Sequence, residues 1–398
     1  MADRGRLAGR AQQPDHDYVV VGAGLLGLAA ARALARRGRE VIVLEQASPG
    51  HEGAGSKGSC RIFRLGYPDP AYVEAALRAR ELWHALENDS SRPILFPTPQ
   101  LSFGTGLTAV QEAMALAGAP GELLPAAEAA ARFPAVAADG PVLLEPDSCV
   151  IAADTALEAL AAGVPEIRTG VRVSALADDG RHVTLRTSQG RLSARVAVVC
   201  AGPWTAELLA GAWDGWRAAS APTLEQVAYL GPAETSPSGP AMPIFICHGS
   251  QSPYGLPVPG SALYKTGIHP SGPPVRPDDQ RQAADPVLAA RLAAAARRHL
   301  PGLDSRPVRV ERCVYDTTPD EDFIVDRVGN VVIGSGTSGH GFKFGPLLGE
   351  WLAGLAIDGQ PGPRVQPGPR RAASWSRLPD DRFALARFSR AGAGSGAG

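Results

Sequence analysis

"DYVVVGAGLLGLAAARALARRGREVIVLEQ", residues 17–46, decides the fold of this chain. The stretch reads as an apolar strand over residues 18–21, an alanine-rich helix over 25–37 and a second apolar strand over 41–44. Glycines fill the turn between the first strand and the helix. A strand that enters a helix through glycines and is followed by another strand is typical of a β-α-β unit with parallel strands. The sequence therefore predicts an α/β fold.

The glycines of this turn have the spacing GxGxxG, formed by Gly22, Gly24 and Gly27. The first glycine permits a tight turn, the second lets a pyrophosphate approach the helix N-terminus, and the third lets helix and strand pack closely. Glu45 ends the second strand, where an acid accepts the ribose hydroxyls of an adenosine. Because the glycines have flanking strands and a terminal acid, we expect this unit to bind a dinucleotide.

Length, charge and cysteine usage narrow the class of protein. The chain has 398 residues, enough for two intertwined domains, and a net charge of −1 that gives no reason to expect nucleic acid or an anionic membrane. No apolar run approaches the roughly 20 residues that span a bilayer. The five cysteines form no CxxC pair, so we expect free thiols and no metal site. Residues 1–16 lack a secretory signal and are expected to be a disordered leader on a cytoplasmic protein.

A second glycine turn follows more than 300 residues later. "NVVIGSGTSGHGFKFGPLLGEWLAGL", residues 330–355, reads as a strand over 331–333, a glycine-rich turn and a helix from about residue 346. A helix N-terminus offers free N–H groups and a partial positive charge. It cannot hold the same pyrophosphate, but it suits a flavin ring, which gains negative charge on reduction. We therefore expect the two turns to hold opposite ends of one FAD.

Four motifs make a family resemblance specific. They are "GSKGSCRIFRLGY" (55–67), "PYGLPVPGSALYKTGIH" (253–269), "ERCVYDTTPDEDFIVD" (311–326) and "SGHGFKF" (338–344). With them the chain resembles the monomeric sarcosine oxidase and N-methyltryptophan oxidase family, within the D-amino-acid-oxidase-like FAD proteins, over roughly residues 16–360. The resemblance implies FAD bound covalently through a cysteine thioether to the flavin 8α-methyl. It also implies oxidation of a secondary amino acid to an imine, with O2 reduced to H2O2.

The expected fold is α/β, with an FAD-binding Rossmann-like domain of the glutathione-reductase type interleaved with a mixed, mostly antiparallel β-sheet substrate domain. Helices are expected over 71–87 and 285–300, a strand meander over 163–201 and an antiparallel sheet over 223–269. The FAD-binding domain is expected to comprise residues 17–88, 146–212 and 311–360, and the substrate domain 89–145 and 213–310. Residues 361–398 are expected to form a partly disordered tail, and the protein to be a monomer.

The resemblance also assigns roles to single residues. Cys313 matches the cysteine that carries the flavin, while Arg64 and Lys343 match the pair that binds the substrate carboxylate. Tyr254 and Tyr315 match the aromatic residues that line the substrate pocket. A guanidinium and an ammonium suit a carboxylate, so the chemistry of these residue types agrees with the assigned roles.

Further assignments concern oxygen and the flavin. Lys265 matches the lysine that activates oxygen, because an ammonium stabilises the superoxide anion. Arg61 matches the arginine nearer the flavin, His269 a pocket histidine, and His340 a residue beside the flavin. The expected catalytic residues are Lys265, Arg61, His269, Tyr254 and Tyr315; the expected cofactor-binding residues are Gly22, Gly24, Gly27, Glu45, Ser56, Arg61, Cys313, Gly339, His340, Gly341 and Lys343.

Three positions depart from the family pattern and leave alternatives open. Lys57 stands where the family usually has a histidine, and Ser59 and Cys60 stand where it often has an Asp-Thr pair. Sarcosine, an N-methyl amino acid, proline and pipecolate all remain candidate substrates. A desaturating imino-acid oxidase of natural-product biosynthesis is one alternative, although Gly339 and His340 favour the sarcosine-oxidase side. An NAD-dependent dehydrogenase and a non-catalytic flavin-binding protein are the others.

Overall fold

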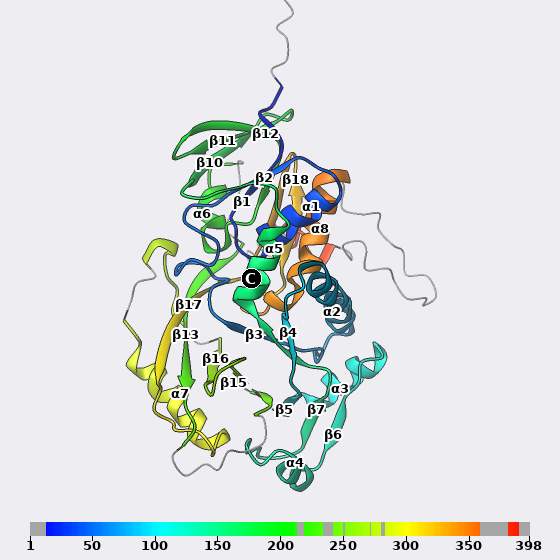
Figure 1. The fold of residues 1–398 in the computed structure, drawn as a ribbon, viewed down its shortest axis with the longest axis vertical. Helices are drawn as coiled ribbons and strands as arrows, with labels where there is room; N and C mark the ends of the chain where they lie inside the picture. The colour runs from blue at the N-terminus through cyan, green and yellow to red at the C-terminus, as the bar shows by residue number, and fades with distance from the viewer. Residues whose placement is uncertain are drawn as a thin grey trace, which may run out of the picture.

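The computed structural model describes residues 13–212, 219–233, 242–249, 251–270, 272–279, 283–358 and 381–389. Most of the expected leader and much of the expected tail lie outside these residues. Figure 1 shows two bodies one above the other, with the N-terminal strand, α1 and α8 in the upper one and α7, α3 and α4 in the lower one. No helix in the described ranges combines the length and the hydropathy that crossing a bilayer requires.

The upper body is built on an eight-stranded sheet. Its main path runs β10-β11-β12-β1-β2-β9, and β19 pairs with β12 and carries β18. Neighbours β1 with β2, β1 with β12, β2 with β9 and β12 with β19 are parallel, which is the Rossmann-like arrangement that the first glycine turn predicts. The strands are β1 (His16–Val21), β2 (Val41–Leu44), β9 (Ile167–Arg168), β10 (Val173–Asp178), β11 (Val183–Thr187), β12 (Gly190–Val199), β18 (Ile324–Val328) and β19 (Val331–Ser335).

Helices α1 (Leu25–Arg36) and α8 (Gly345–Asp358), each of which follows a glycine turn, pack side by side on this sheet (Figure 1). Their axes approach closely because Gly349 presents no side chain: a Cβ there would lie 2.5 Å from the Ala29 backbone. Helices α2 (Pro70–Ser90) and α5 (Ala153–Ala162) complete the apolar core on that face. Asp69 caps α2 by accepting a hydrogen bond from the Ala71 amide.

The lower body contains a second sheet of eight strands, in the order β17-β13-β16-β15-β14-β5-β7-β6. Only the β14–β5 pair is parallel among its described neighbours, so the expectation of a mixed, mostly antiparallel sheet is confirmed. Its strands are β5 (Gln100–Gly104), β6 (Glu122–Leu124), β7 (Val142–Glu145), β13 (Ala221–Leu230), β14 (Ile244–His248), β15 (Ser252–Pro257), β16 (Tyr264–His269) and β17 (Arg309–Thr317). Helices α3 (Leu107–Leu116), α4 (Ala126–Arg132) and α7 (Pro286–His299) pack around it.

Two features join the bodies. A three-stranded sheet is formed by β3 (Cys60–Phe63), β8 (Cys149–Ala152) and β4 (Leu95–Pro97), and Figure 1 shows β3 and β4 between the two bodies. Strand β17 pairs with β13 along residues 221–229, so the FAD-binding segment expected at 311–360 begins inside a strand of the second sheet. The chain then passes from β17 through β18 and β19 into the second glycine turn, which brings that turn against the second sheet.

Candidate functional site

The first glycine turn has no room for side chains. Gly22 has a φ of +100°, and a Cβ on it would lie 2.4 Å from the carbonyl oxygen of Cys200. A Cβ on Gly27 would lie 1.9 Å from the Gly22 oxygen. Both contacts are with backbone, which cannot move aside. The hydroxyl of Ser56 accepts a hydrogen bond from the Leu25 amide at 3.0 Å, so Ser56 lies at the N-terminus of α1.

Glu45 closes the turn from the end of β2. Its carboxylate is buried and accepts hydrogen bonds from the amides of Ala23 at 2.7 Å and Ala47 at 2.9 Å. Glu45 also lines the cavity described below. A carboxylate has about four lone-pair positions, so two amide bonds leave capacity for ribose hydroxyls.

One cavity of about 920 Å³ runs from the first glycine turn to the second sheet. Every residue that the sequence singled out for the site lines it, except Gly27, which packs beneath the turn. Its volume lies at the upper end for ligand pockets, as an extended cofactor and a substrate require. Residues from β1, β2, β3, β16, β17 and the second glycine turn therefore meet in one space.

The second glycine turn lies on the other side of β12. A Cβ on Gly334 would lie 3.2 Å from Cys200 Sγ, so Cys200, at the end of β12, lies between the two turns. The short helical turn Phe342–Phe344 then leads directly into α8. The two turns thus open into the same cavity from the ends of parallel strands, where α/β sheets bind their ligands.

Six cations line the cavity, and two of them form ion pairs, Lys57 with Glu52 and Arg172 with Asp278. The other four, Arg61, Arg64, Lys265 and Lys343, form no ion pair with a carboxylate among the residues that the structure describes. Arg61 donates to the carbonyls of Cys60 at 2.9 Å and Gly55 at 3.3 Å. Lys265 donates to the same Cys60 carbonyl at 3.3 Å. Cations without carboxylate partners imply anionic guests, and FAD with an anionic substrate fits this set.

Burial is the main cause of the lowered pKa of both lysines, Lys265 and Lys343. Burial, with the nearby Arg61 guanidinium, lowers the pKa of Lys265. Burial and then Arg64 hold the pKa of Lys343 well below its ordinary value. An anion bound beside either ammonium would favour its charged form.

At the substrate end, Lys343 is held by a hydrogen-bonded group. Its Nζ donates to the hydroxyl of Tyr67 at 2.9 Å and to the carbonyl of His340 at 2.8 Å. The Tyr67 hydroxyl lies 3.3 Å from His340 Nδ1. The guanidinium of Arg64 lies over the Tyr67 ring, 4.1 Å from its centre. Arg64 and Lys343 therefore meet around one tyrosine that the sequence did not single out.

Two tyrosines and a histidine form the facing wall. The hydroxyls of Tyr254 and Tyr315 lie 3.5 Å apart, and the ring of His269 lies 5.6 Å from that of Tyr315. Burial raises the pKa of Tyr254 to about 12 and that of Tyr315 well above its ordinary value. Burial lowers the pKa of His269. All three side chains are therefore uncharged at neutral pH.

Cys313, in β17, also lines the cavity. Burial raises its pKa, while Lys265 and Arg61 act in the opposite direction. Cys60 is fully buried and gives its carbonyl, not its sulfur, to Arg61 and Lys265. Ser59 Oγ is buried and has no hydrogen-bond partner among the described residues. Lys57 is paired with Glu52, 2.8 Å away, at the cavity wall.

Two buried acids that the sequence analysis did not name position the site. Asp316 in β17 accepts hydrogen bonds from the Gly336 amide at 2.8 Å and from the Ser335 hydroxyl, which fastens the second glycine turn to β17. Glu145 in β7 accepts from the amide of Gly66 at 2.8 Å, which fixes the turn between Arg64 and Tyr67. For Glu145, a single acid at the end of the buried apolar strand Val142–Glu145 was the available signal. Within the described part of the chain, no group of three or more His, Cys, Asp or Glu could hold a metal ion.

The comparison with protein families decides the class. The family described as FAD dependent oxidoreductase matches residues 17–355. The chain belongs to this family. The resemblance to the sarcosine oxidase and N-methyltryptophan oxidase group, inferred from four motifs, is thereby confirmed together with the Rossmann-like FAD-binding fold. The chain is an FAD-dependent oxidoreductase of the amine and amino-acid oxidase type, which rules against the NAD-dependent and non-catalytic alternatives.

Relatives and solved structures agree with this assignment. Monomeric sarcosine oxidase of Bacillus sp. (strain NS-129) is 31% identical over 367 residues, which cover 86% of this chain and 93% of that protein. Peroxisomal sarcosine oxidase of Mus musculus is 32% identical over 371 residues, covering 87% and 93%. Among structures, NikD, an amino acid oxidase of nikkomycin biosynthesis, superposes with a TM-score of 0.77 at 27% identity, over 87% of this chain and 95% of that one.

Proposed function

We propose that this protein oxidises a secondary α-amino acid to an imine and passes the electrons through FAD to O2, giving H2O2. Sarcosine, an N-methyl amino acid or a cyclic imino acid such as proline or pipecolate is the substrate. When bound, FAD supplies the acceptor for the hydride at N5. Relatives named sarcosine oxidase and N-methyl-L-tryptophan oxidase, both at about 30% identity over most of the chain, support this class of substrate.

The observation that carries the proposal is the pair of cations at Tyr67. Arg64 comes from the end of β3 and Lys343 from the second glycine turn, so two segments about 280 residues apart place cations around one ring. A carboxylate that bridges them would fix the α-carbon beside the turn expected to hold the flavin. Because carboxylate and amine share that carbon, anchoring one orients the other.

The surrounding side chains suit a neutral amine. Tyr254 and Tyr315 remain protonated because burial raises the pKa of both. They wall the space without adding charge, which favours a small or flat substituent on the substrate. A neutral amine needs no general base on the protein before hydride transfer.

The remaining assignments belong to the same proposal. FAD is held by the first glycine turn and Glu45 at one end and by the second turn at the other, with Arg61 and His340 beside the flavin. Cys313 forms the 8α-S-cysteinyl thioether with the flavin. Lys265 activates O2. The protein acts as a cytoplasmic monomer on a small molecule, without nucleic acid or membrane.

A second candidate is a desaturating imino-acid oxidase that oxidises one substrate more than once. The structural similarity to NikD supports it. Counting H2O2 per molecule of a cyclic imino acid separates the two: one equivalent indicates a single oxidation, and two or more indicate repeated oxidation to an aromatic acid.

The test of the main proposal compares each N-methyl or cyclic amino acid with its amide. H2O2 release is measured for wild type, Arg64→Met and Lys343→Met. We expect the acids to be oxidised and the amides to react poorly, and each variant to lose about 2–5 kcal/mol of carboxylate binding, as for one partner of a buried charge pair. Equal rates for acid and amide would refute carboxylate recognition.

A further inference from the structure

A C-terminal segment outside the family-matched residues 17–355 lies against the cavity wall. We call residues 382–388 the C-terminal strap; it comprises most of the helical turns Asp381–Phe383 and Ala386–Ser389 and the two residues between them. Phe383 is buried against the rings of Phe323, 5.6 Å away, and Trp351, 5.8 Å away. Arg382 donates to Asp69 Oδ2 at 2.5 Å, and Asp69 itself lines the cavity. The strap is therefore anchored in the core of the FAD-binding body.

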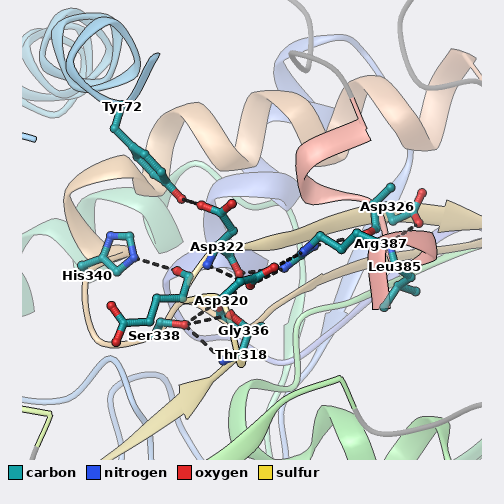
Figure 2. A network of polar contacts seen from close by, with 12 residues as sticks. Tyr72, Thr318, Asp320, Asp322, Asp326, Gly336, Ser338, His340, Leu385 and Arg387 are labelled. Atoms are coloured by element: carbon teal, nitrogen blue, oxygen red, sulfur yellow. Dashed lines mark hydrogen bonds and ion pairs between the residues drawn. The ribbon is translucent and has the colours of Figure 1, made fainter. Parts of the chain in front are cut away.

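Arg387 of the strap binds the loop over residues 318–322 (Figure 2). Its Nε donates to Asp320 Oδ2 at 2.7 Å and its Nη2 to Asp320 Oδ1 at 3.2 Å. The same Nη2 donates to the carbonyl of Asp322 at 2.9 Å. Burial opposes the effect, but Arg387 lowers the pKa of Asp320 below its usual value. One guanidinium thus holds the residues on both sides of Glu321.

Glu321 has a conformation that needs such support. Its φ is +61°, in the left-handed region that non-glycine residues adopt rarely and at a cost in free energy. This backbone turns the Glu321 carbonyl toward His340, whose Nε2 lies 3.0 Å from it. Strained backbone persists where its surroundings over-determine it, and here both neighbouring residues are held by Arg387.

The carbonyl of Glu321 fixes the direction of the hydrogen bonds that follow. It can only accept, so His340 Nε2 must donate and Nδ1 of the neutral ring is left to accept. Tyr67 then donates its hydroxyl proton to Nδ1 and accepts from Lys343 Nζ with its oxygen. Burial and Lys343 hold the pKa of His340 well below its ordinary value, which keeps the ring neutral. The ammonium of Lys343 is therefore oriented through three residues from the loop that Arg387 holds.

We propose that Arg387 is a positioning residue for the carboxylate site: by holding Glu321 in its left-handed conformation it fixes His340, Tyr67 and Lys343 for substrate binding. This inference rests on the proposed function, in which Arg64 and Lys343 bind the substrate carboxylate. It assigns a role in substrate affinity to a segment of the chain that contributes no residue to the cavity wall among those described.

The experiment measures binding to the flavin-loaded enzyme. The probe is methoxyacetate, which is sarcosine with an ether oxygen in place of the amine, and binding is followed by the change in the flavin spectrum. We expect Arg387→Ala to weaken methoxyacetate binding and to raise KM for the amino-acid substrate by about tenfold, with kcat changed much less. Arg387→Lys keeps the ion pair with Asp320 but loses the paired hydrogen bonds of Nε and Nη2. Its affinity for methoxyacetate should therefore lie between those of wild type and Arg387→Ala.

The matched control is Arg306→Ala. Arg306 makes the same two-pronged contact with Asp304, 2.7 Å away at its closest, on the exposed loop before β17 and outside the cavity wall. Its removal should leave methoxyacetate binding unchanged. Introducing Glu321→Asn into the Arg387→Ala protein should restore most of the lost affinity, because asparagine tolerates the left-handed region better than glutamate.

The outcomes distinguish failure of the proposed carboxylate site from failure of the positioning role of Arg387. If wild type fails to bind methoxyacetate, the proposed carboxylate site is refuted, and so is the role of Arg387 that depends on it. If wild type binds but Arg387→Ala and Arg387→Lys bind as tightly, the proposed function stands and the positioning role is refuted. If Arg387→Ala fails to retain flavin, Arg387→Lys decides: unchanged methoxyacetate affinity in that variant refutes the role. A kcat that falls as much as KM rises in both variants would show general disruption and also refute it.

Discussion

The backbone of Gly339 lies directly against the ring of Tyr315: a Cβ on Gly339 would lie 2.2 Å from Tyr315 Cε2. Gly339 also has a φ of +73°. The second glycine turn and the tyrosine wall of the cavity are therefore in contact, and the position of one fixes the other. Asp316, one residue after that tyrosine, ties the same two segments together through the Gly336 amide.

We expect Gly339→Ala to damage both stability and catalysis, because the new methyl group must displace Tyr315. Gly118→Ala is the matched control, since Gly118 has a φ of +72° with nothing within 4 Å of its hypothetical Cβ. The control should lose only the strain of about 1–2 kcal/mol that left-handed backbone imposes on a side chain. Thermal unfolding and kcat/KM measured on both variants check this. Equal effects on kcat/KM would show that the Tyr315 contact is unimportant.

Cys313 should hold the flavin covalently. Acid precipitation of the purified protein should leave a yellow pellet, and Cys313→Ala should release the flavin into the supernatant while still binding FAD before denaturation. Cys149→Ala and Cys247→Ala serve as controls, because neither thiol lines the cavity. A colourless wild-type pellet would refute the attachment, and release by Cys60→Ala instead would assign it to β3.

Lys265 and Lys343 should act in opposite half-reactions. Lys265→Met should slow reoxidation of the reduced enzyme by O2 by orders of magnitude, the scale of several kcal/mol of lost electrostatic stabilisation. It should change anaerobic reduction by substrate much less. Lys343→Met should show the reverse pattern, because its ammonium lies at Tyr67 and not at Cys60. Stopped-flow absorbance resolves the two steps, and parallel losses in either variant contradict this division.

Carboxylate binding should weaken as pH rises. Burial and Arg64 hold the pKa of Lys343 well below its ordinary value, and a bound carboxylate would raise it, so binding above the lowered pKa takes up a proton. The Kd for methoxyacetate should therefore increase by up to about tenfold per pH unit above that pKa. Two neighbours of Lys343 do not titrate in this range: burial and Lys343 hold the pKa of His340 well below its ordinary value, and burial raises the pKa of Tyr67 to about 12.

Lys343→Met provides the control for this pH dependence. It should bind methoxyacetate more weakly than wild type but with a Kd that no longer changes over the same range. A pH dependence that survives in Lys343→Met would assign the proton to another group.

Much of the fold could be predicted from short, local patterns in the sequence. The spacing of Gly22, Gly24 and Gly27 with flanking apolar strands predicted the first unit, and α1 ends at Arg36, one residue before the expected end. The second glycine turn was also predicted from a local pattern, and the helix expected from residue 346 begins at Gly345. The expected helix at 71–87 begins one residue earlier, at Pro70, where Asp69 caps it, and runs three residues further, to Ser90.

Other features depend on contacts that the sequence does not display. Helices α3, α4 and α5 were not predicted; they are short, and α4 has only Ala129 buried. Glu145 reaches the Arg64–Tyr67 turn across about 80 residues, and Arg387 reaches Asp320 across 67. Family motifs pointed to the side chains that line the cavity. The residues that hold those side chains in place became visible only when distant segments were brought together.

The position of β12 between β1 and β19 also has a consequence for biosynthesis. A ribosome adds about 5–20 residues per second, so β1 waits roughly 10–40 seconds before residues 194–199 emerge to pair with it. Strand β19 and α8, which complete the second turn, appear more than 130 residues later still. A site that contains both glycine turns therefore exists only after α8 has been synthesised. A prematurely terminated product that lacks α8 would leave the apolar face of α1 uncovered, which makes such fragments targets for chaperones and proteases rather than partially active enzymes.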